Sequence, residues 1–280
     1  MMRTAFQRTL RSSAGLRGRG LHTGEECEIE ILPADPNSGV VFSAGDDEIR
    51  AVVENVRDTN RGTTLSNGKA EIHTVEHLLA ALAGMLVDNA RIRICGPEIP
   101  AADGSALPFV ELIESAGIIE QDVTARIARL REPVRVGDDS RYLRAEPAEG
   151  LKVSGLVSFA HPLIGEQAFS AALDPETFNR EIAPARTFCT SDEIEAILAL
   201  GLGKGGTEDN VIVVHEDHYS TPLRFDNEFV RHKVLDLIGD LSLIGKRLYA
   251  NVTGVKTSHF LNIALTDKIA RLEAGGWQGG

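Results

Sequence analysis

Three polar residues recur at four-residue intervals in the segment FVRHKVLDLIGDL, namely His232, Asp236 and Asp240. On a helix this spacing places them along one stripe, because positions four apart share a face. The rest of the segment is mostly Val, Leu and Ile, so the helix and its polar stripe are expected to be buried. Two buried carboxylates need compensating positive charge. Either Lys233 or a divalent cation bound by His232 and Asp236 would supply it.

A second segment, HTVEHLLAALAG, places Glu76 and His77 at the start of another apolar run. His77 would complete a ligand set of two imidazoles and one carboxylate with His232 and Asp236. Such a set without a thiolate favours Zn²⁺ with one position open for water, although iron accepts the same ligands. Glu76 would then take a proton from that water. The alternative interpretation is an ordinary His–Asp ion pair without metal, because His-x-x-x-Asp on a helix commonly forms such a pair.

His259 is the remaining histidine with a candidate role, in the segment VKTSHFLNIAL. It follows a predicted strand, and a histidine at a strand end is well placed to act as a general acid. A surface-loop histidine looks the same in sequence, so both interpretations stand. The other histidines are interpreted as structural or surface residues: His22, His73, His161, His215 and His218.

The two polar clusters lie in halves of the chain that repeat one order of elements. The first half predicts strands up to about residue 70, then a helix at 74–86, a strand at 89–95 and a helix at 107–117. The second half predicts strands within 132–159, a helical segment at 191–201, a helix at 229–245 and a strand at 249–255. Aligned on His77 and His232, each helix has a glycine seven positions later, at Gly84 or Gly239.

This repeat predicts an α+β fold of two similar β/α domains. If each domain is a sheet with helices on one face, the two pack helix to helix as a β-α-α-β sandwich. The candidate boundary gives an N-terminal domain of residues 1–122, with Glu76 and His77, and a C-terminal domain of residues 123–280, with the other candidates. A cleft between domains is a common place for a site.

The composition of the 280-residue chain narrows the classes of function. A formal net charge of −12 disfavours nucleic-acid binding, because it would repel a phosphate backbone. No apolar run approaches the roughly 20 residues of a membrane-spanning helix, so any membrane contact would be peripheral. Cys27, Cys95 and Cys189 lack a C-x-x-C spacing, which fits a reducing, cytoplasmic location and predicts no cysteine metal site. No obligate protein partner is predicted.

Longer motifs run through nearly the whole chain: GLHTG, VRDTNRGTTL, HTVEHLLAALAG, PEIPAADGSALPF, KGGTEDNVIVV, LRFDNEFVRHKVLDLIGDL and KTSH. Together they resemble the UDP-3-O-acyl-N-acetylglucosamine deacetylases, zinc enzymes of lipid A biosynthesis in Gram-negative bacteria. The resemblance implies two β/α domains with the helices between the sheets. It also implies hydrolysis of the N-acetyl group of a small nucleotide-sugar that carries an acyl chain, with release of acetate.

The resemblance further implies a role for each matching residue. Zn²⁺ ligands would be His77, His232 and Asp236, with Glu76 as general base and a protonated His259 as acid. Lys233 and Thr187 would stabilise the oxyanion, Asp240 would orient His259, and Phe188 would line the substrate cleft. These roles are chemically consistent, because cationic and hydroxyl donors meet the charge that develops on oxygen.

The chain departs from the family pattern near the expected substrate, at Ala102, Thr190, Ser258 and Phe260. Phe260 and Thr190 are expected to alter the shape of the pocket. The apolar residues of the segment 191–201 predict either a wall of the acyl passage or an ordinary amphipathic helix over the core.

Two further functions therefore stay open. One is a paralogous zinc deacetylase acting on a different N-acetylated sugar, and the other is a catalytically silent binding protein on the same scaffold. Retention of every ligand and of both proton carriers argues against the silent protein.

Overall fold

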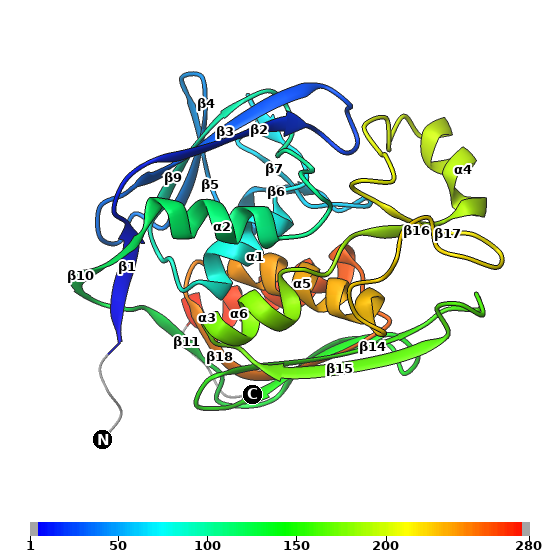
Figure 1. Ribbon diagram of the computed structural model, residues 1–280. Helices are drawn as coiled ribbons and strands as arrows, with labels where there is room; N and C mark the ends of the chain where they lie inside the picture. The colour runs from blue at the N-terminus through cyan, green and yellow to red at the C-terminus, as the bar shows by residue number, and fades with distance from the viewer. Residues whose placement is uncertain (1–4, 276–280) are drawn as a thin grey trace.

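The computed structural model describes residues 5–275, in which two sheets enclose a layer of helices (Figure 1). The first sheet contains β2 (Ala14–Arg19), β3 (Glu26–Pro33), β4 (Val40–Ala44), β5 (Asp47–Arg50) and β9 (Ala90–Cys95). The second contains β11 (Ile127–Arg129), β12 (Val134–Gly137), β13 (Tyr142–Pro147), β14 (Leu151–Ser158), β15 (Glu166–Ala172) and β18 (Arg247–Val255). Between them lie α1 (Glu76–Gly84), α2 (Leu107–Ala116), α5 (Glu228–Ser242) and α6 (His259–Ala274).

The two sheets have the same strand order and directions. The first reads β2-β3-β9-β4-β5 and the second reads β12-β13-β18-β14-β15, with β11 added beside β18. In each sheet the central strand, β9 or β18, is antiparallel to one neighbour and parallel to the other. Each central strand also follows one helix and precedes another. The predicted α+β fold is therefore confirmed, and the repeat extends through helix, strand and helix.

Smaller elements connect the layers and carry the loops. They are β1 (Phe6–Leu10) paired with β10 (Ile118–Thr124), β6 (Val56–Asp58), β7 (Thr64–Ser66), β8 (Glu71–Ile72), α3 (Pro175–Thr177), β16 (Phe188–Thr190), α4 (Ile194–Ala199) and β17 (Ile212–Val214). Strand β10 spans the predicted boundary after residue 122, so that division of the chain stays a prediction.

Alternation along the central strands explains why helices cover only one face of each sheet. In β9 the buried side chains Ala90, Ile92 and Ile94 alternate with residues that face solvent, and β18 alternates in the same way. Because successive side chains of a strand point to opposite faces, such a strand has one apolar face to cover. The helices cover it, and their other sides pack against one another.

Helix α6 is an element that the sequence analysis did not predict. His259 does follow a strand, β18, as expected, and it is also the first residue of a 16-residue helix whose N-cap is Ser258. The buried face of α6 includes Asn262 and Thr266 as well as apolar residues. Polar residues on the buried face weaken the hydrophobic periodicity by which a helix is detected in sequence.

Helices α1 and α5 touch at a glycine. A methyl group at residue 239 would lie 2.1 Å from the backbone oxygen of Glu76, so only glycine allows the two helices to come this close. Its counterpart in the repeat, Gly84, packs against Phe178, whose ring would be 2.2 Å from an added methyl group. Both glycines that the repeat singled out are thus points of close packing.

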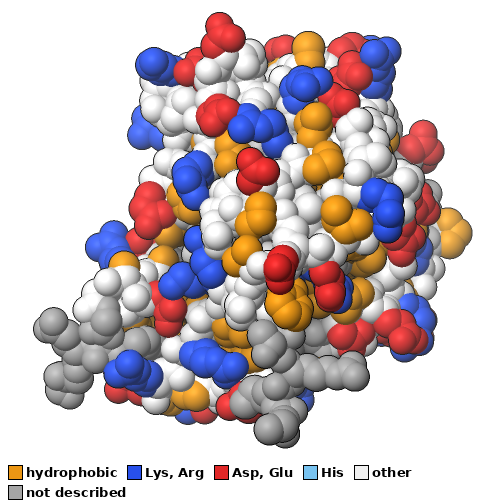
Figure 2. Space-filling view, turned by 90° about the vertical axis from the view of Figure 1, so that its left-hand side faces the viewer, with side chains coloured by type: hydrophobic (Ala, Val, Ile, Leu, Met, Phe, Trp, Pro, Cys, Tyr) orange, Lys and Arg blue, Asp and Glu red, His pale blue; other side chains and the backbone are white. Residues whose placement is uncertain are grey.

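The face of the molecule near β1 and β10 carries acidic and basic side chains that intermingle without separating by sign (Figure 2). Among residues 5–275, no helix combines the length and the apolar character that crossing a bilayer requires. The cysteines Cys27, Cys95 and Cys189 are all free thiols.

Replacing Gly239 with Ala is expected to destabilise the protein, because the added methyl group meets backbone that cannot rotate away. We expect the free energy of unfolding to fall by roughly 1–3 kcal/mol, measured by denaturant titration. Gly150→Ala is the control, since nothing lies within 4 Å of a methyl group there. Equal stability of the two variants would contradict the close contact at Gly239.

Candidate metal centre

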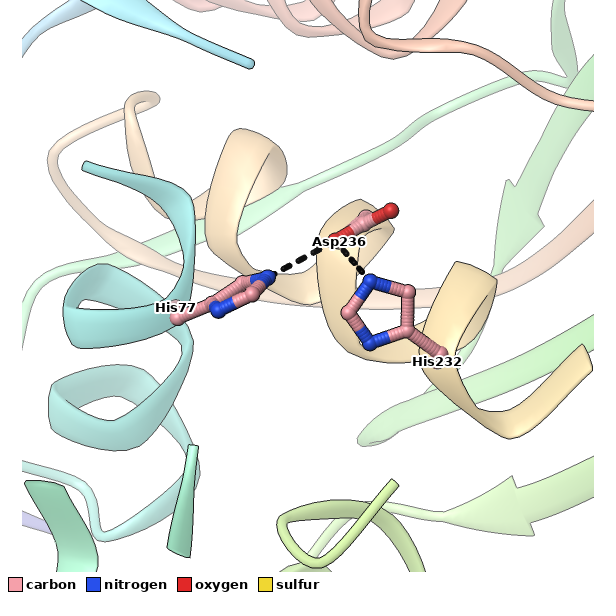
Figure 3. A group of neighbouring side chains, drawn as sticks. All are labelled: His77, His232 and Asp236. Carbon is pink, nitrogen blue, oxygen red and sulfur yellow. Dashed lines mark ion pairs between the residues drawn. The ribbon is translucent and has the colours of Figure 1, made fainter. Parts of the chain in front are cut away.

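His77, His232 and Asp236 converge from the two central helices (Figure 3). His77 comes from the first turn of α1, and the other two lie one turn apart on α5. The Nε2 atoms of His77 and His232 are each 3.4 Å from Oδ1 of Asp236. The three candidate ligand atoms lie within 4.8 Å of one another. Figure 3 shows the side chains pointing toward one common centre.

The chemistry of this group fits a cation. Oδ1 of Asp236 is buried and has no hydrogen-bond partner, which is costly for a carboxylate oxygen. Nδ1 of His232 lies 3.1 Å from the carbonyl oxygen of Ala185, which can only accept, so Nδ1 carries the proton and Nε2 keeps its lone pair. Burial lowers the pKa of His232 to about 3, so the ring is neutral at pH 7. Two imidazoles, one carboxylate and no thiolate suit Zn²⁺.

Lys233 compensates only one side of the Asp236 carboxylate. Its Nζ donates to Oδ2 of Asp236 at 2.9 Å, while Oδ1 faces the histidines. Burial alone would raise the pKa of Asp236, but His232 and Lys233 hold it well below its ordinary value. At neutral pH His232 is uncharged, so the cations that remain near Asp236 are Lys233 and the protonated His259, and both lie nearest to its Oδ2. Of the two sources of positive charge that the sequence allowed, one is therefore present and the geometry leaves room for the other.

Glu76 and His259 lie beside this centre with complementary electrostatics. Oε1 of Glu76 is 3.7 Å from Nε2 of His259, and Nε2 is 3.8 Å from Oδ2 of Asp236. Burial raises the pKa of the Glu76 carboxyl. Burial would lower the pKa of His259, but Asp240 and Glu76 outweigh it and raise that pKa to about 9. One group is a carboxylate poised to take up a proton, and the other is an imidazolium that holds one.

Asp240 fixes the ring of His259. Its Oδ2 accepts hydrogen bonds from Nδ1 of His259 and from Nδ2 of Asn262, both at 2.8 Å. With Nδ1 bound to the carboxylate, Nε2 is the nitrogen directed at Glu76 and Asp236. The structure thus buries His259 within the site and excludes the surface-loop interpretation.

A cavity of about 320 Å³ adjoins the centre. Lys233 and His259 contribute to its lining, together with Thr187 and with Phe188, the first residue of the short strand β16. The ring of Phe188 packs edge-on near His232, with centroids 6.2 Å apart, and Nζ of Lys233 lies 5.7 Å from its centre. The apolar residues Ile194, Ile197 and Leu198 form another part of the wall. The segment 191–201 therefore faces the cavity through α4.

Comparison with known proteins identifies the family. Residues 7–271 match the family model described as UDP-3-O-acyl N-acetylglycosamine deacetylase. The chain belongs to this family. A UDP-3-O-acyl-N-acetylglucosamine deacetylase of Anaeromyxobacter sp. (strain Fw109-5) is 44% identical over 94% of this chain and 88% of its own length. The corresponding Myxococcus xanthus protein is 43% identical over 94% of this chain and 86% of its own length. That of Thioalkalivibrio sulfidiphilus is 42% identical over 91% of this chain and 87% of its own length.

The departures from the deacetylase family pattern lie off the cavity wall. Phe260 is 69% exposed, and the hydroxyl of Thr190 bonds to Glu193 in the cap that starts the helical turn before α4. Among the described residues, the cavity lining includes neither, so their expected effect on the shape of the pocket would be indirect and stays a prediction. Ser258 is the N-cap of α6, and Ala102 lies in a turn at φ 51°. These positions give no reason to expect an altered substrate.

Three residues near the site had no assigned role in the sequence interpretation. His22, interpreted as structural or surface, lines the cavity and has a buried Nδ1 without a hydrogen-bond partner. Arg61 lines it too, and its guanidinium pairs with Glu193 at 3.0 Å. Thr63 contacts both Glu76 and Asp240. The only sequence signal for them was that they lie within the GLHTG and VRDTNRGTTL motifs of the deacetylase family.

Removing one member of the three-residue group is expected to abolish metal binding in this deacetylase-family protein. Purified wild type should contain about one zinc per chain by elemental analysis, and His77→Ala and Asp236→Ala should each retain little of it, because each would leave only two of the three candidate ligands. His73→Ala is the control, since its Nδ1 bonds to Thr64 outside the group. Zinc at the wild-type level in both ligand variants would rule out this centre.

Proposed function

We propose that this protein hydrolyses the N-acetyl group of UDP-3-O-acyl-N-acetylglucosamine in the cytoplasm, giving UDP-3-O-acyl-glucosamine and acetate in lipid A biosynthesis. Zn²⁺ would be held by His77, His232 and Asp236. The observation that carries this proposal is the unpartnered Oδ1 of Asp236, faced by two imidazoles and flanked by a base and an acid. Membership of the deacetylase family supports it.

The bound ion would supply a polarised amide carbonyl and a water of lowered pKa. Glu76 is placed to take a proton from the water that attacks the carbonyl carbon, and its raised pKa suits a group that must then hold that proton. His259 gives the proton on Nε2 to the sugar nitrogen as the carbon–nitrogen bond breaks. The products are acetate and a free amine, and the two proton carriers account for both transfers.

The negative charge that develops on the amide oxygen needs nearby donors. Lys233 is held in place by Asp236 and lines the cavity, and its pKa is raised because Asp236 outweighs the effect of burial. The hydroxyl of Thr187 is available from the same wall. A fixed cation and a hydroxyl that meet an oxyanion lower the barrier most when they are positioned before the reaction.

The cavity wall suggests how the substrate is held. The apolar side chains of α4 and Phe188 provide a surface for the acyl chain, while Lys233 and His259 mark the polar end where the sugar reacts. The paralogous deacetylase and the silent binding protein have no observation in their favour, because the departures from the family pattern lie away from this cavity.

Glu76→Gln is expected to keep the zinc and lose activity. The amide has nearly the same shape as the carboxylate but cannot accept the proton, so we expect kcat to fall by about 100-fold or more. Acetate release from UDP-3-O-acyl-N-acetylglucosamine and zinc content would be measured on the same samples. Wild-type protein that releases acetate only from other N-acetylated sugars would show that the paralogous function is correct.

The dependence of kcat/KM on pH should fall at high pH as His259 loses its proton. Its pKa is raised from 6.5 to about 9 by anionic neighbours, and a bound cation would repel the imidazolium and move the midpoint below about 9. On this limb, activity should therefore be lost as pH rises through the midpoint. Asp240→Asn removes an anion that raises this pKa, so the high-pH limb should shift to lower pH. An unshifted limb would show that another group is the acid.

A further inference from the structure

Thr63 is a buried residue that bridges the two proton carriers. It is 0% exposed and is the last residue of the turn between β6 and β7, directly after Arg61 and Gly62. Its backbone N–H donates to Oε2 of Glu76 at 2.9 Å, and its hydroxyl donates to Oδ1 of Asp240 at 2.6 Å. One residue from a loop of the first half therefore contacts a carboxylate on α1 and a carboxylate on α5.

The backbone of Thr63 is itself fixed to the start of α1. Its carbonyl oxygen accepts from the N–H of Val75, the residue before that helix, at 3.1 Å. A methyl group at the neighbouring Gly62 would lie only 3.1 Å from Oε1 of Glu76, so the turn packs tightly on this carboxylate. The position of the Thr63 hydroxyl is thus set by the same contacts that hold Glu76.

The hydroxyl has one role that its neighbours cannot take over. Oδ2 of Asp240 accepts hydrogen bonds from His259 and Asn262, whereas Oδ1 accepts one from the hydroxyl of Thr63. Oγ1 of Thr63 lies 3.3 Å from Nδ1 of His259, but both groups direct their protons to the carboxylate. Among the described residues Oδ1 has no other side-chain partner, so loss of the hydroxyl frees this carboxylate to turn. The ring of His259 would turn with it.

We propose that Thr63 is a positioning residue that sets the general acid relative to the general base. Its N–H orients Glu76, and its hydroxyl orients Asp240 and through it Nε2 of His259. This inference rests on the proposed function for its kinetic consequence, although the hydrogen-bond geometry does not depend on it. Removing a partner that orients a reacting group typically costs about 10–100-fold in activity.

Thr63→Val tests the hydroxyl alone, because valine has nearly the same shape and keeps the backbone N–H. Thr64→Val is the matched control. Thr64 is the next residue, is also buried, and its hydroxyl bonds to Nδ1 of His73 at 3.0 Å, away from the site. In the zinc-loaded full chain we expect Thr63→Val to lower kcat about tenfold or more with KM and zinc content unchanged. Thr63→Ser should restore kcat, and Thr64→Val should resemble wild type.

The path through Asp240 is tested by adding Thr63→Val to Asp240→Asn. If the hydroxyl acts through this carboxylate, the double variant should lose no more kcat than Asp240→Asn alone. Independent, multiplying losses would overturn the proposal. So would a Thr63→Val enzyme with the kcat of the Thr64→Val control, or a Thr63→Ser enzyme as impaired as Thr63→Val. If the valine variant does not fold, Thr63→Ala removes the same hydroxyl and is judged by the same comparisons.

A measurement without substrate separates this inference from the proposed function. In histidine ¹⁵N NMR of the zinc-loaded chain, the Nδ1 proton of His259 should shift or broaden in Thr63→Val and stay unchanged in Thr64→Val. An unchanged signal in Thr63→Val would overturn the positioning role. Failure of wild type to release acetate would instead refute the proposed function and leave this NMR comparison to decide the inference.

Discussion

The contact between α1 and α5 is the constraint on which the rest of the site depends. The two helices belong to the two halves of the repeat, and they meet where Gly239 lies against the backbone of Glu76. Because Gly239 sits between Asp236 and Asp240 in sequence, this contact brings both carboxylates to the first turn of α1. The approach that places Glu76 beside the polar stripe of α5 also places His77 opposite Asp236. Close packing of two backbones thereby sets the spacing of the ligands and of the proton carriers.

The charges gathered by this contact do not balance. Glu76, Asp236 and Asp240 are all buried, and the cations that face them are Lys233 and a protonated His259. Two cations leave one negative charge among three carboxylates. The imbalance can be relieved in two ways, by protonating Glu76 or by binding a cation near Asp236. Burial raises the pKa of Glu76 and so favours the first way, and the unpartnered Oδ1 of Asp236 marks where the second would act.

Much of the site was predictable because it lies on helices with regular spacing. The stripe of His232, Asp236 and Asp240 follows from helical geometry alone, and the repeat predicted that a second helix would bring His77 to it. The α+β fold followed from the same repeat. Helix α6 was missed because Asn262 and Thr266 lie on its buried face, and these polar residues serve Asp240 rather than the core. A function that requires buried polar groups thus obscures the pattern by which the element is recognised.

Hydrophobic periodicity could not indicate a role for Thr63 or Arg61, because both lie in the turn between β6 and β7. Their positions depend on contacts between segments far apart in the chain, such as Thr63 with Asp240 and Arg61 with Glu193. The second contact ties the turn to the cap that starts the helical turn before α4, whose apolar side chains line the cavity. One short turn therefore reaches the proton carriers on one side and the apolar wall on the other. If the proposed function holds, that turn would connect the wall offered to the acyl chain with the residues that cleave the amide.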